Sequence, residues 1–225
     1  MNKIHQTVII EGDVKIGDRN TILPNCIIYG PVEIGDDNLI GPNVVIGTPG
    51  QDTRNRYYDS SNCKIKIGNR NIIREFTAIQ KPCYEDITMI CDDVYLMQSV
   101  HIPHDAHLYN HVVVTPMTVL AGLAKVLDGA NLAIGCALNQ RTTIGQYSIA
   151  AAGAVVMKNI KPFSRYIPGK SISVNKYAID KYGYGAFYDE IASYVLEDTT
   201  PTSPEITSIV NVFNSWVEKY GLETY

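Results

Sequence analysis

Residues 90–156 read ICDDVYLMQSVHIPHDAHLYNHVVVTPMTVLAGLAKVLDGANLAIGCALNQRTTIGQYSIAAAGAVV, and every sixth residue in this stretch is apolar. The recurring residues are Ile90, Leu96, Ile102, Leu108, Val114, Leu120, Val126, Leu132, Leu138, Ile144, Ala150 and Val156. A period of six fits neither an α-helix nor the plain alternation of a single β-strand. It is typical of a parallel β-helix, in which three short strands make one triangular coil of about 18 residues. We therefore expect a mainly β fold whose recurring aliphatic residues point into a shared core.

The same period extends over most of the chain. Isoleucine recurs at every sixth position over residues 10–46, and again over residues 67–79. The repeat ends at residues 161–169, KPFSRYIPG, where two prolines and a glycine turn the chain away from the coil. We expect residues 1–167 to form one β-helix domain.

Two segments interrupt the repeat and are expected to form loops near residues 48–64 and 81–88. The spacing from Ile46 to Ile67 is 21 residues, which exceeds one coil of about 18 by about three. Insertions in a solenoid map to loops on one face, which is often the binding face. The longer loop is therefore a candidate part of a site, and the less favoured alternative is a tolerated surface insertion.

Residues 168–225 have a different pattern and are expected to form a small C-terminal α-helical region. Helices are expected over residues 175–182, 186–197 and 204–220, and Ser203 is a plausible N-cap of the last one. Apolar residues recur at intervals of three and four in this last segment. We expect this stripe to pack on the side of the solenoid or on a neighbouring subunit.

The composition excludes some classes of protein. The net charge is −4 at pH 7, whereas a nucleic-acid-binding protein needs a basic surface. No apolar run approaches the roughly 18 residues of a membrane span, and the repeat begins too early to leave room for a signal peptide. The five cysteines lack CxxC spacing, so we expect reduced thiols in the cytoplasm, at least two of them inside the coils.

The register of the repeat predicts one column with complementary chemistry. Residues 18 apart lie one above another, separated by roughly 4.8 Å. His104, Gly122 and Gln140 therefore share an outer column, which contains an imidazole, an unobstructed backbone N–H and an amide. A histidine base and an N–H that holds an oxyanion are the two parts that acyl transfer requires. Asp105 can orient the imidazole only where a corner brings these two adjacent side chains to the same side.

The neighbouring histidines have a simpler explanation. His107 and His111 lack a comparable column partner, so we expect both to be solvated surface side chains. No cluster of cysteines or carboxylates stands at ligand spacing around them, and we expect neither a metal site nor a cofactor.

Beyond these patterns, the chain resembles the UDP-N-acetylglucosamine O-acyltransferases (LpxA), which begin lipid A synthesis for bacterial outer membranes. Hexapeptide repeats occur in many acyltransferases, so the likeness depends on short motifs and on their spacing. These motifs are GQD at 50–52, IGNRNIIREFTAI at 67–79, HIPHD at 101–105, LAG at 120–122, NQ at 139–140, and Asn175 with the AIDKYG that follows shortly after it.

The resemblance implies a left-handed β-helix that assembles as a homotrimer, with active sites in the clefts between subunits. It implies direct transfer of an acyl group, 3-hydroxyacyl in this family, from acyl carrier protein to a hydroxyl of a UDP-amino sugar. His104 matches the family's general base, Asp105 its supporting acid and Gly122 its oxyanion N–H. The matches to acceptor-binding and nucleotide-binding positions are Gln51, Asp52, Arg54, His101, Asn139, Gln140 and Asn175.

Several positions depart from the family pattern. Histidines are frequent in the family where this chain has Leu123 and Asn139. The family's tail has a carboxylate and two basic residues where this chain has Tyr177, Lys181 and Tyr182. Ala152 stands where the family has a glycine that limits acyl length, so we expect a shorter acyl slot.

These departures keep two other hypotheses open. The chain could be an N-acyltransferase that uses a short acyl-CoA on a nucleotide-linked amino sugar for surface-polysaccharide synthesis. An amine is a better nucleophile than a hydroxyl, so this reaction would depend less on His104. It could also be a scaffold or a sugar-nucleotide-binding solenoid without activity. The retained column of His104, Gly122 and Gln140 argues against this last hypothesis.

Overall fold

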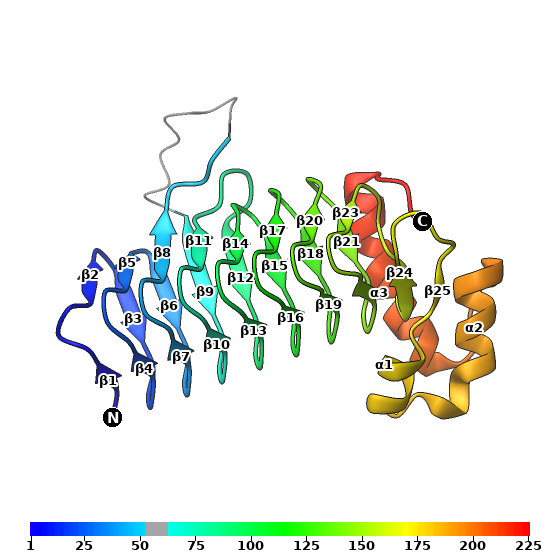
Figure 1. The fold of residues 1–225 in the computed structure, drawn as a ribbon, viewed down its shortest axis with the longest axis horizontal. Helices are drawn as coiled ribbons and strands as arrows, with labels where there is room; N and C mark the ends of the chain where they lie inside the picture. The colour runs from blue at the N-terminus through cyan, green and yellow to red at the C-terminus, as the bar shows by residue number, and fades with distance from the viewer. Residues whose placement is uncertain (53–62) are drawn as a thin grey trace.

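The chain folds as an elongated stack of coils with a helical region at its C-terminal end (Figure 1). The computed structural model describes residues 1–52 and 63–225. Strands of successive coils pair in parallel and build three sheets, which we call A, B and C. The fold is the parallel β-helix predicted from the six-residue period, with the left-handed sense that the family resemblance implies.

Each coil contributes one short strand to each sheet. Sheet A consists of β1 (Lys3–Ile4), β4 (Thr21–Ile22), β7 (Leu39–Ile40), β10 (Ile72–Ile73), β13 (Tyr95–Leu96), β16 (Val113–Val114), β19 (Asn131–Leu132), β22 (Ile149–Ala150), β24 (Ser164–Tyr166) and the antiparallel β25 (Ser173–Val174). Sheet B consists of β2 (Ile9–Glu11), β5 (Ile27–Tyr29), β8 (Val45–Thr48), β11 (Ala78–Gln80), β14 (His101–Ile102), β17 (Val119–Leu120), β20 (Ala137–Leu138) and β23 (Val155–Val156). Sheet C consists of β3 (Val14–Ile16), β6 (Val32–Ile34), β9 (Lys64–Ile67), β12 (Ile87–Ile90), β15 (His107–Leu108), β18 (Lys125–Val126) and β21 (Thr143–Ile144).

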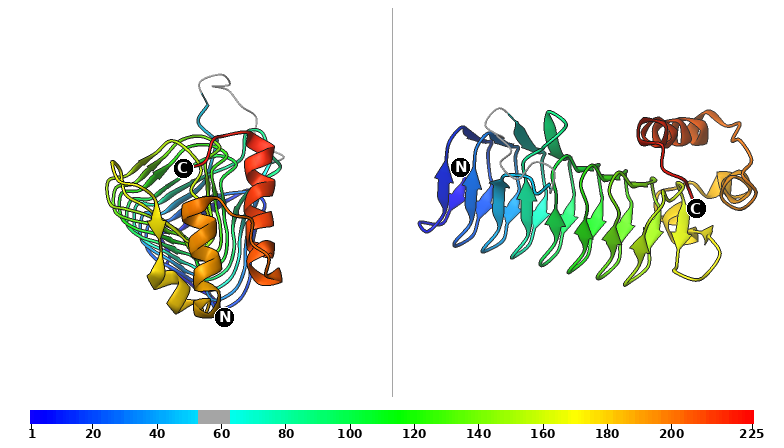
Figure 2. Two further views of the ribbon diagram at one scale, coloured as in Figure 1. Left: turned by 90° about the vertical axis from the view of Figure 1, so that its right-hand side faces the viewer. Right: turned by 90° about the horizontal axis from the view of Figure 1, so that it is seen from above.

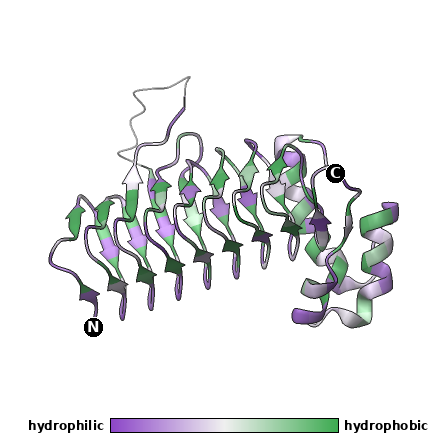
Figure 3. Cartoon of the chain, in the orientation of Figure 1, coloured by the Kyte–Doolittle hydropathy of each residue, from purple (hydrophilic) through white to green (hydrophobic). Residues whose placement is uncertain are grey.

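The core runs along the inside of the coils. Every recurring apolar residue from Ile22 to Val156 is buried, and Cys26 and Cys136 fill small positions beside them. Along the strands these apolar residues alternate with polar ones (Figure 3). The five cysteines are free thiols, in agreement with the prediction. Ile10 remains 40% exposed in β2, which is the edge strand of sheet B.

The first insertion is longer than predicted. Ile46 pairs with Ile79 in sheet B, whereas Ile67 belongs to sheet C and pairs with Ile34. The step from Ile46 to Ile67 is therefore one side of the triangle and not a full coil. Ile34 and Ile67 are 33 residues apart, where uninterrupted coils repeat every 18, so the insertion adds 15 residues.

The C-terminal region contains three α-helices and forms a second core. The helices are α1 (Lys176–Lys181), α2 (Tyr188–Glu197), which a short 3₁₀-helix η1 (Gly185–Phe187) precedes, and α3 (Pro204–Tyr220). Their buried apolar side chains pack together with Phe163 from the end of the solenoid. Ser203 occupies the N-cap position of α3, but its hydroxyl donates to Glu190 at 2.6 Å and does not cap the helix.

The helices lie beside the last coils and leave the N-terminal coils uncovered (Figure 2). Helix α3 contacts sheet C, where the ring of Trp216 meets the ring of His107 edge-on at 5.7 Å. The predicted apolar stripe is buried at Ile206, Val210 and Phe213, and the first two belong to the second core, while α3 also contacts β21 of sheet C. None of the described helices is long and apolar enough to cross a membrane.

Candidate active site

His104 and Asp105 form a buried pair at the corner between sheets B and C. The Nδ1 atom of His104 lies 2.6 Å from a carboxylate oxygen of Asp105. Asp105 adopts the left-handed backbone conformation, with φ of 62°, and this corner brings the two adjacent side chains together. His104 is 2% exposed and Asp105 is fully buried. With its Nδ1–H directed at the carboxylate, the imidazole keeps Nε2 free to accept a proton.

The second loop holds Asp105 in place, which the sequence did not reveal. The backbone N–H groups of Cys83, Tyr84 and Glu85 donate to the carboxylate of Asp105 at 3.1, 3.1 and 2.8 Å. The hydroxyl of Thr88 accepts from the backbone N–H of Asp105 at 3.0 Å. The three backbone N–H groups satisfy a carboxylate that is removed from water. Together with Thr88 they fix the residue that orients His104.

Gly122 lies directly above the imidazole ring of His104. The pairing of His101 with Val119 and of Val119 with Ala137 confirms the predicted 18-residue register, which stacks positions 104, 122 and 140. A methyl group added at Gly122 would overlap the imidazole ring, so only glycine lets the ring approach this backbone. The N–H of Gly122 has no hydrogen-bond partner among the described residues.

The GQD motif lies beside the pair. A Cβ atom on Gly50 would overlap His104 and Cys83, which shows how closely this backbone passes the histidine. Asp52 is 8% exposed and accepts a hydrogen bond from the hydroxyl of Tyr84 at 2.6 Å. Gln51 is exposed. Arg54, the predicted nucleotide contact, lies outside the described residues.

Cys83 and Tyr84 are neighbours of His104 that the sequence reasoning missed. The ring of Tyr84 meets the ring of His104 edge-on at 5.7 Å. Burial and the nearby charges of Asp105 and Asp52 raise the pKa of the Cys83 thiol to about 11. Cys83 therefore stays protonated at neutral pH and is a poor nucleophile.

His101 begins an apolar column on the outer face of sheet B. It pairs with Val119, and the column continues through Ala137 to Val155 in successive coils. Val119 and Val155 are 48% and 57% exposed. Burial lowers the pKa of His101, and the neighbouring His104 lowers it further, so His101 is neutral at pH 7. The column gives an apolar path that leads away from His104.

A buried ionic cluster connects the second loop to α3. Glu85 accepts hydrogen bonds from Lys125 at 2.7 Å, Lys219 at 2.6 Å and Tyr220 at 2.7 Å. Burial by itself raises the pKa of Glu85, but its hydrogen bonds outweigh burial and hold the pKa well below its usual range. Burial lowers the pKa of Lys125 to about 8.

His107 belongs to this cluster, and the prediction that it is a solvated surface side chain was wrong. It is buried under Trp216, and its Nε2 lies 3.2 Å from Glu85. The sequence could not place α3 over this side of sheet C. His111 is exposed, as predicted.

The remaining predicted residues fall into two groups. Gln140 is exposed and Asn139 is half-buried, and both lie in the turn one coil beyond Gly122. Ala152 is also exposed, but it lies at the corner between sheets A and B. Asn175 lies at the third corner, between sheets C and A, where its amide donates to the carbonyl of Tyr147 at 2.8 Å. A single chain thus does not bring Asn175 to the corner of His104.

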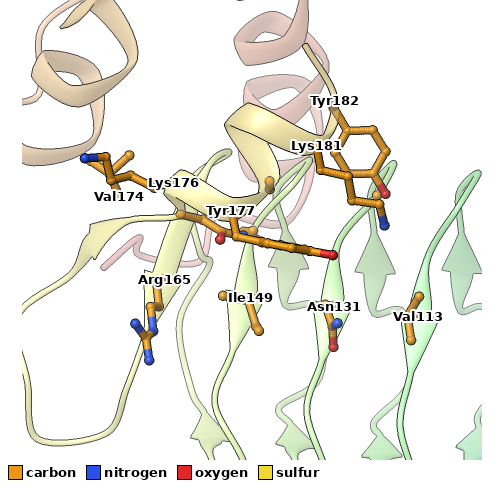
Figure 4. Close-up of a pocket in the computed structure, with 13 residues that line it drawn as sticks. Val113, Asn131, Ile149, Arg165, Val174, Lys176, Tyr177, Lys181 and Tyr182 are labelled. Atoms are coloured by element: carbon orange, nitrogen blue, oxygen red, sulfur yellow. The ribbon is translucent and has the colours of Figure 1, made fainter. Parts of the chain in front are cut away.

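Asn175 lines a cavity of about 400 Å³ between α1 and the outer face of sheet A. Tyr177, Lys181 and Tyr182, the three tail positions that depart from the family pattern, line it as well. The ring of Tyr177 extends from α1 over the strands below, and Arg165 contributes a further cation (Figure 4). This cationic and aromatic cavity suits a nucleotide, whose base stacks on rings and whose phosphates need positive charge.

Comparisons with known proteins agree with this picture. The family described as bacterial transferase hexapeptide (six repeats) matches residues 13–48. An acyl-[acyl-carrier-protein]–UDP-N-acetylglucosamine O-acyltransferase of Burkholderia lata is 34% identical over 108 residues, and the match covers 47% of this chain and 41% of the relative. The enzyme of the same description from Burkholderia thailandensis is 33% identical over the same length. The match thus spans less than half the length of these curated relatives.

Solved structures extend the likeness to nearly the whole chain. LpxA of Bacteroides fragilis, a UDP-N-acetylglucosamine acyltransferase, has a TM-score of 0.75 at 26% identity, with 95% of both chains covered. The UDP-N-acetylglucosamine acyltransferase of Francisella novicida has a TM-score of 0.79 at 20% identity, with 97% of this chain and 85% of that chain covered. The resemblance stated from the sequence motifs is therefore confirmed.

Proposed function

We propose that this chain, which resembles the UDP-N-acetylglucosamine O-acyltransferases in sequence and in fold, is an acyltransferase. Its donor is the acyl thioester of acyl carrier protein, with 3-hydroxyacyl as the expected group, and its acceptor is a hydroxyl of a UDP-amino sugar. The observation that carries the proposal is the His104–Asp105 pair, packed against the open backbone of Gly122. The reaction is the first step of a lipid A type synthesis, which places the chain in the cytoplasm with its substrates.

The geometry supports direct transfer in two steps. Nε2 of His104 takes the proton from the acceptor hydroxyl while its oxygen attacks the thioester carbonyl, and the charge that develops on the carbonyl oxygen is held by the N–H of Gly122. The tetrahedral intermediate then collapses, the carbon–sulfur bond breaks, and the departing thiolate receives the proton from His104. Asp105 stabilises the imidazolium between these steps.

The outer face of sheet B provides the acyl slot in this proposal. The column from His101 through Val119 and Ala137 to Val155 is apolar, and Ala152 lies at the corner beyond it. An acyl chain that follows this face ends near Ala152, whose methyl group shortens the available length. The slot therefore favours a shorter acyl group than the same slot with glycine at 152.

A neighbouring subunit completes the acceptor site in this proposal. Asn175 and the cavity under α1 lie at a different corner of the triangle from His104. Three chains around a common axis bring the α1 corner of one subunit to the His104 corner of the next, while Gln51, Asp52, Gln140 and Asn139 contact the sugar from the first subunit. The separation of the two half-sites supports a homotrimer, whose formation is checked by light scattering.

The experiment is a thiol-release assay with purified protein. Hydroxyacyl carrier protein and acetyl-CoA serve as donors, each paired with UDP-N-acetylglucosamine and with UDP- or dTDP-linked amino sugars. Turnover with the carrier protein and a hydroxyl acceptor is expected. Turnover restricted to a CoA donor and an amine acceptor would replace the proposal with N-acylation, and no turnover with any pair would leave a solenoid that binds without catalysis.

A further inference from the structure

A second hollow lies on the sheet C side of the His104 corner. It has a volume of about 460 Å³ and is lined by Tyr84, Glu85, Leu123, Arg141, Lys219 and Tyr220. Tyr84 is the residue whose ring meets His104 at 5.7 Å, and Leu123 directly follows Gly122. Whatever occupies this hollow is therefore next to the reacting groups.

The charges that face the hollow are not balanced. Glu85 is the single carboxylate among its lining residues, and it already has two ammonium partners, the buried Lys125 and the half-exposed Lys219. Arg141 is exposed, and its guanidinium has no hydrogen bond or ion pair with any described residue. Among the lining residues, two cations, Arg141 and Lys219, thus stand against one carboxylate.

We propose that this hollow binds a phosphate group of a substrate of the His104 reaction, with Arg141 as the main contact and Lys219 as the second. The planar guanidinium of arginine matches two phosphate oxygens at once, and a lysine adds a point charge. The volume of the hollow is within the usual range for a small-molecule site. The proposal rests on the proposed function for the identity of the substrates.

Two substrates of acyl transfer carry the required chemistry. The 4′-phosphopantetheine arm of an acyl carrier protein has a phosphate at its far end, and a nucleotide sugar has a diphosphate. The cavity under α1 already offers Arg165 and Lys181 to a nucleotide at another corner. The two sources are distinguished by binding measurements, one for each.

Isothermal titration calorimetry on the purified full chain tests the site. The ligands are 4′-phosphopantetheine with pantetheine as its phosphate-free comparison, and UDP-N-acetylglucosamine with N-acetylglucosamine. The variants are Arg141→Gln and Lys219→Gln, and Arg19→Gln removes the same charge from the N-terminal coils, outside both cavities, as a matched control. A charged hydrogen bond contributes about 1.5–3 kcal/mol, so Arg141→Gln should weaken one phosphate ligand by about 10- to 100-fold.

The outcomes separate the site from the proposed function. A loss in Arg141→Gln that is confined to one phosphate ligand, and absent in its phosphate-free comparison and in Arg19→Gln, supports the site and names the source. Unchanged affinity for both phosphate ligands, or an equal loss with the phosphate-free compounds, overturns it. The measurement needs no turnover, so a chain that binds phosphate through Arg141 without catalysis refutes only the proposed function.

Discussion

Replacing Lys125 by methionine tests the buried cluster that supports the candidate site. Lys125 is fully buried, and its ammonium donates to Glu85 at 2.7 Å and to the backbone carbonyl of Asp105 at 2.8 Å. Methionine keeps the length of the side chain and its packing against Trp216, so the loss is mainly electrostatic. We expect Lys125→Met to lower the stability of the fold. Because the backbone carbonyl of Asp105 loses its donor, kcat/KM for acyl transfer should fall about tenfold as well, which corresponds to about 1.4 kcal/mol in activation free energy.

The size of the stability loss in Lys125→Met depends on the hydrogen-bond partners that Glu85 retains. Removing one partner of a buried pair typically costs about 3–5 kcal/mol when the other charge is left alone. Glu85 retains Lys219 and Tyr220, so the lost bonds count as charged hydrogen bonds, and we expect a decrease of about 2 kcal/mol in the free energy of unfolding. For a chain of this size that decrease corresponds to a Tm lower by about 4–8 °C.

Urea denaturation and thermal melts of four proteins provide the assay: the wild type, Lys125→Met, Glu85→Gln and the double variant. The double variant has neither charge, so its decrease in the free energy of unfolding should be smaller than the sum of the two single decreases by at least about 1 kcal/mol. Lys219→Met is the matched control, because this half-exposed lysine bonds to the same carboxylate but is screened by water, and its loss should be about 0.5 kcal/mol or less. Additive losses within about 0.5 kcal/mol, or a Lys125→Met loss no larger than that of Lys219→Met, would show that Lys125 and Glu85 are not a coupled pair.

Three further predictions concern the acid limb of stability, the oxyanion position and the acyl slot. The pKa of Glu85 is lower in the folded chain than in the unfolded chain. Its contribution to the free energy of unfolding is therefore fully present above about pH 4.3 and is lost as the pH falls toward the folded pKa. Glu85→Gln should flatten this pH dependence in urea titrations at pH 3 to 5, and a curve parallel to that of the wild type would contradict the prediction. Gly122→Ala should lower kcat by about 100-fold or more in thiol release, because the methyl group displaces the imidazole of His104; an unchanged kcat would exclude the predicted contact. Ala152→Gly should shift the preferred donor to a longer acyl chain in competition assays, and an unchanged preference would remove Ala152 from the slot.

The coils could be predicted from the sequence because each core position obeys a local rule. A residue every six positions must face inward, so Ile102 and Leu120 are placed without knowledge of distant contacts, and the stacking of His104 under Gly122 follows from the same count. The corner that joins His104 to Asp105 was a condition of the prediction, and the φ of 62° at Asp105 fulfils it.

The support of the site could not be predicted because it depends on contacts between distant segments. Tyr84 and Glu85 lie in a loop without a repeat, and their backbone direction is set by the carboxylate of Asp105 about twenty residues later. Lys125 occupies an outward position of sheet C, where a lysine is normally solvated, and it is buried only because α3 folds back over it. His107 was misjudged for the same reason.

The role of His104 as the base of an acyl transfer is tested by the thiol-release rate of His104→Ala, measured beside the wild type and Asp105→Asn. We expect kcat of His104→Ala to fall by about 100- to 10,000-fold, kcat of Asp105→Asn to lie between those of His104→Ala and the wild type, and the Kd for the nucleotide sugar to remain within a few-fold of the wild type. A His104→Ala protein that releases thiol within threefold of the wild-type rate would show that His104 is not the base.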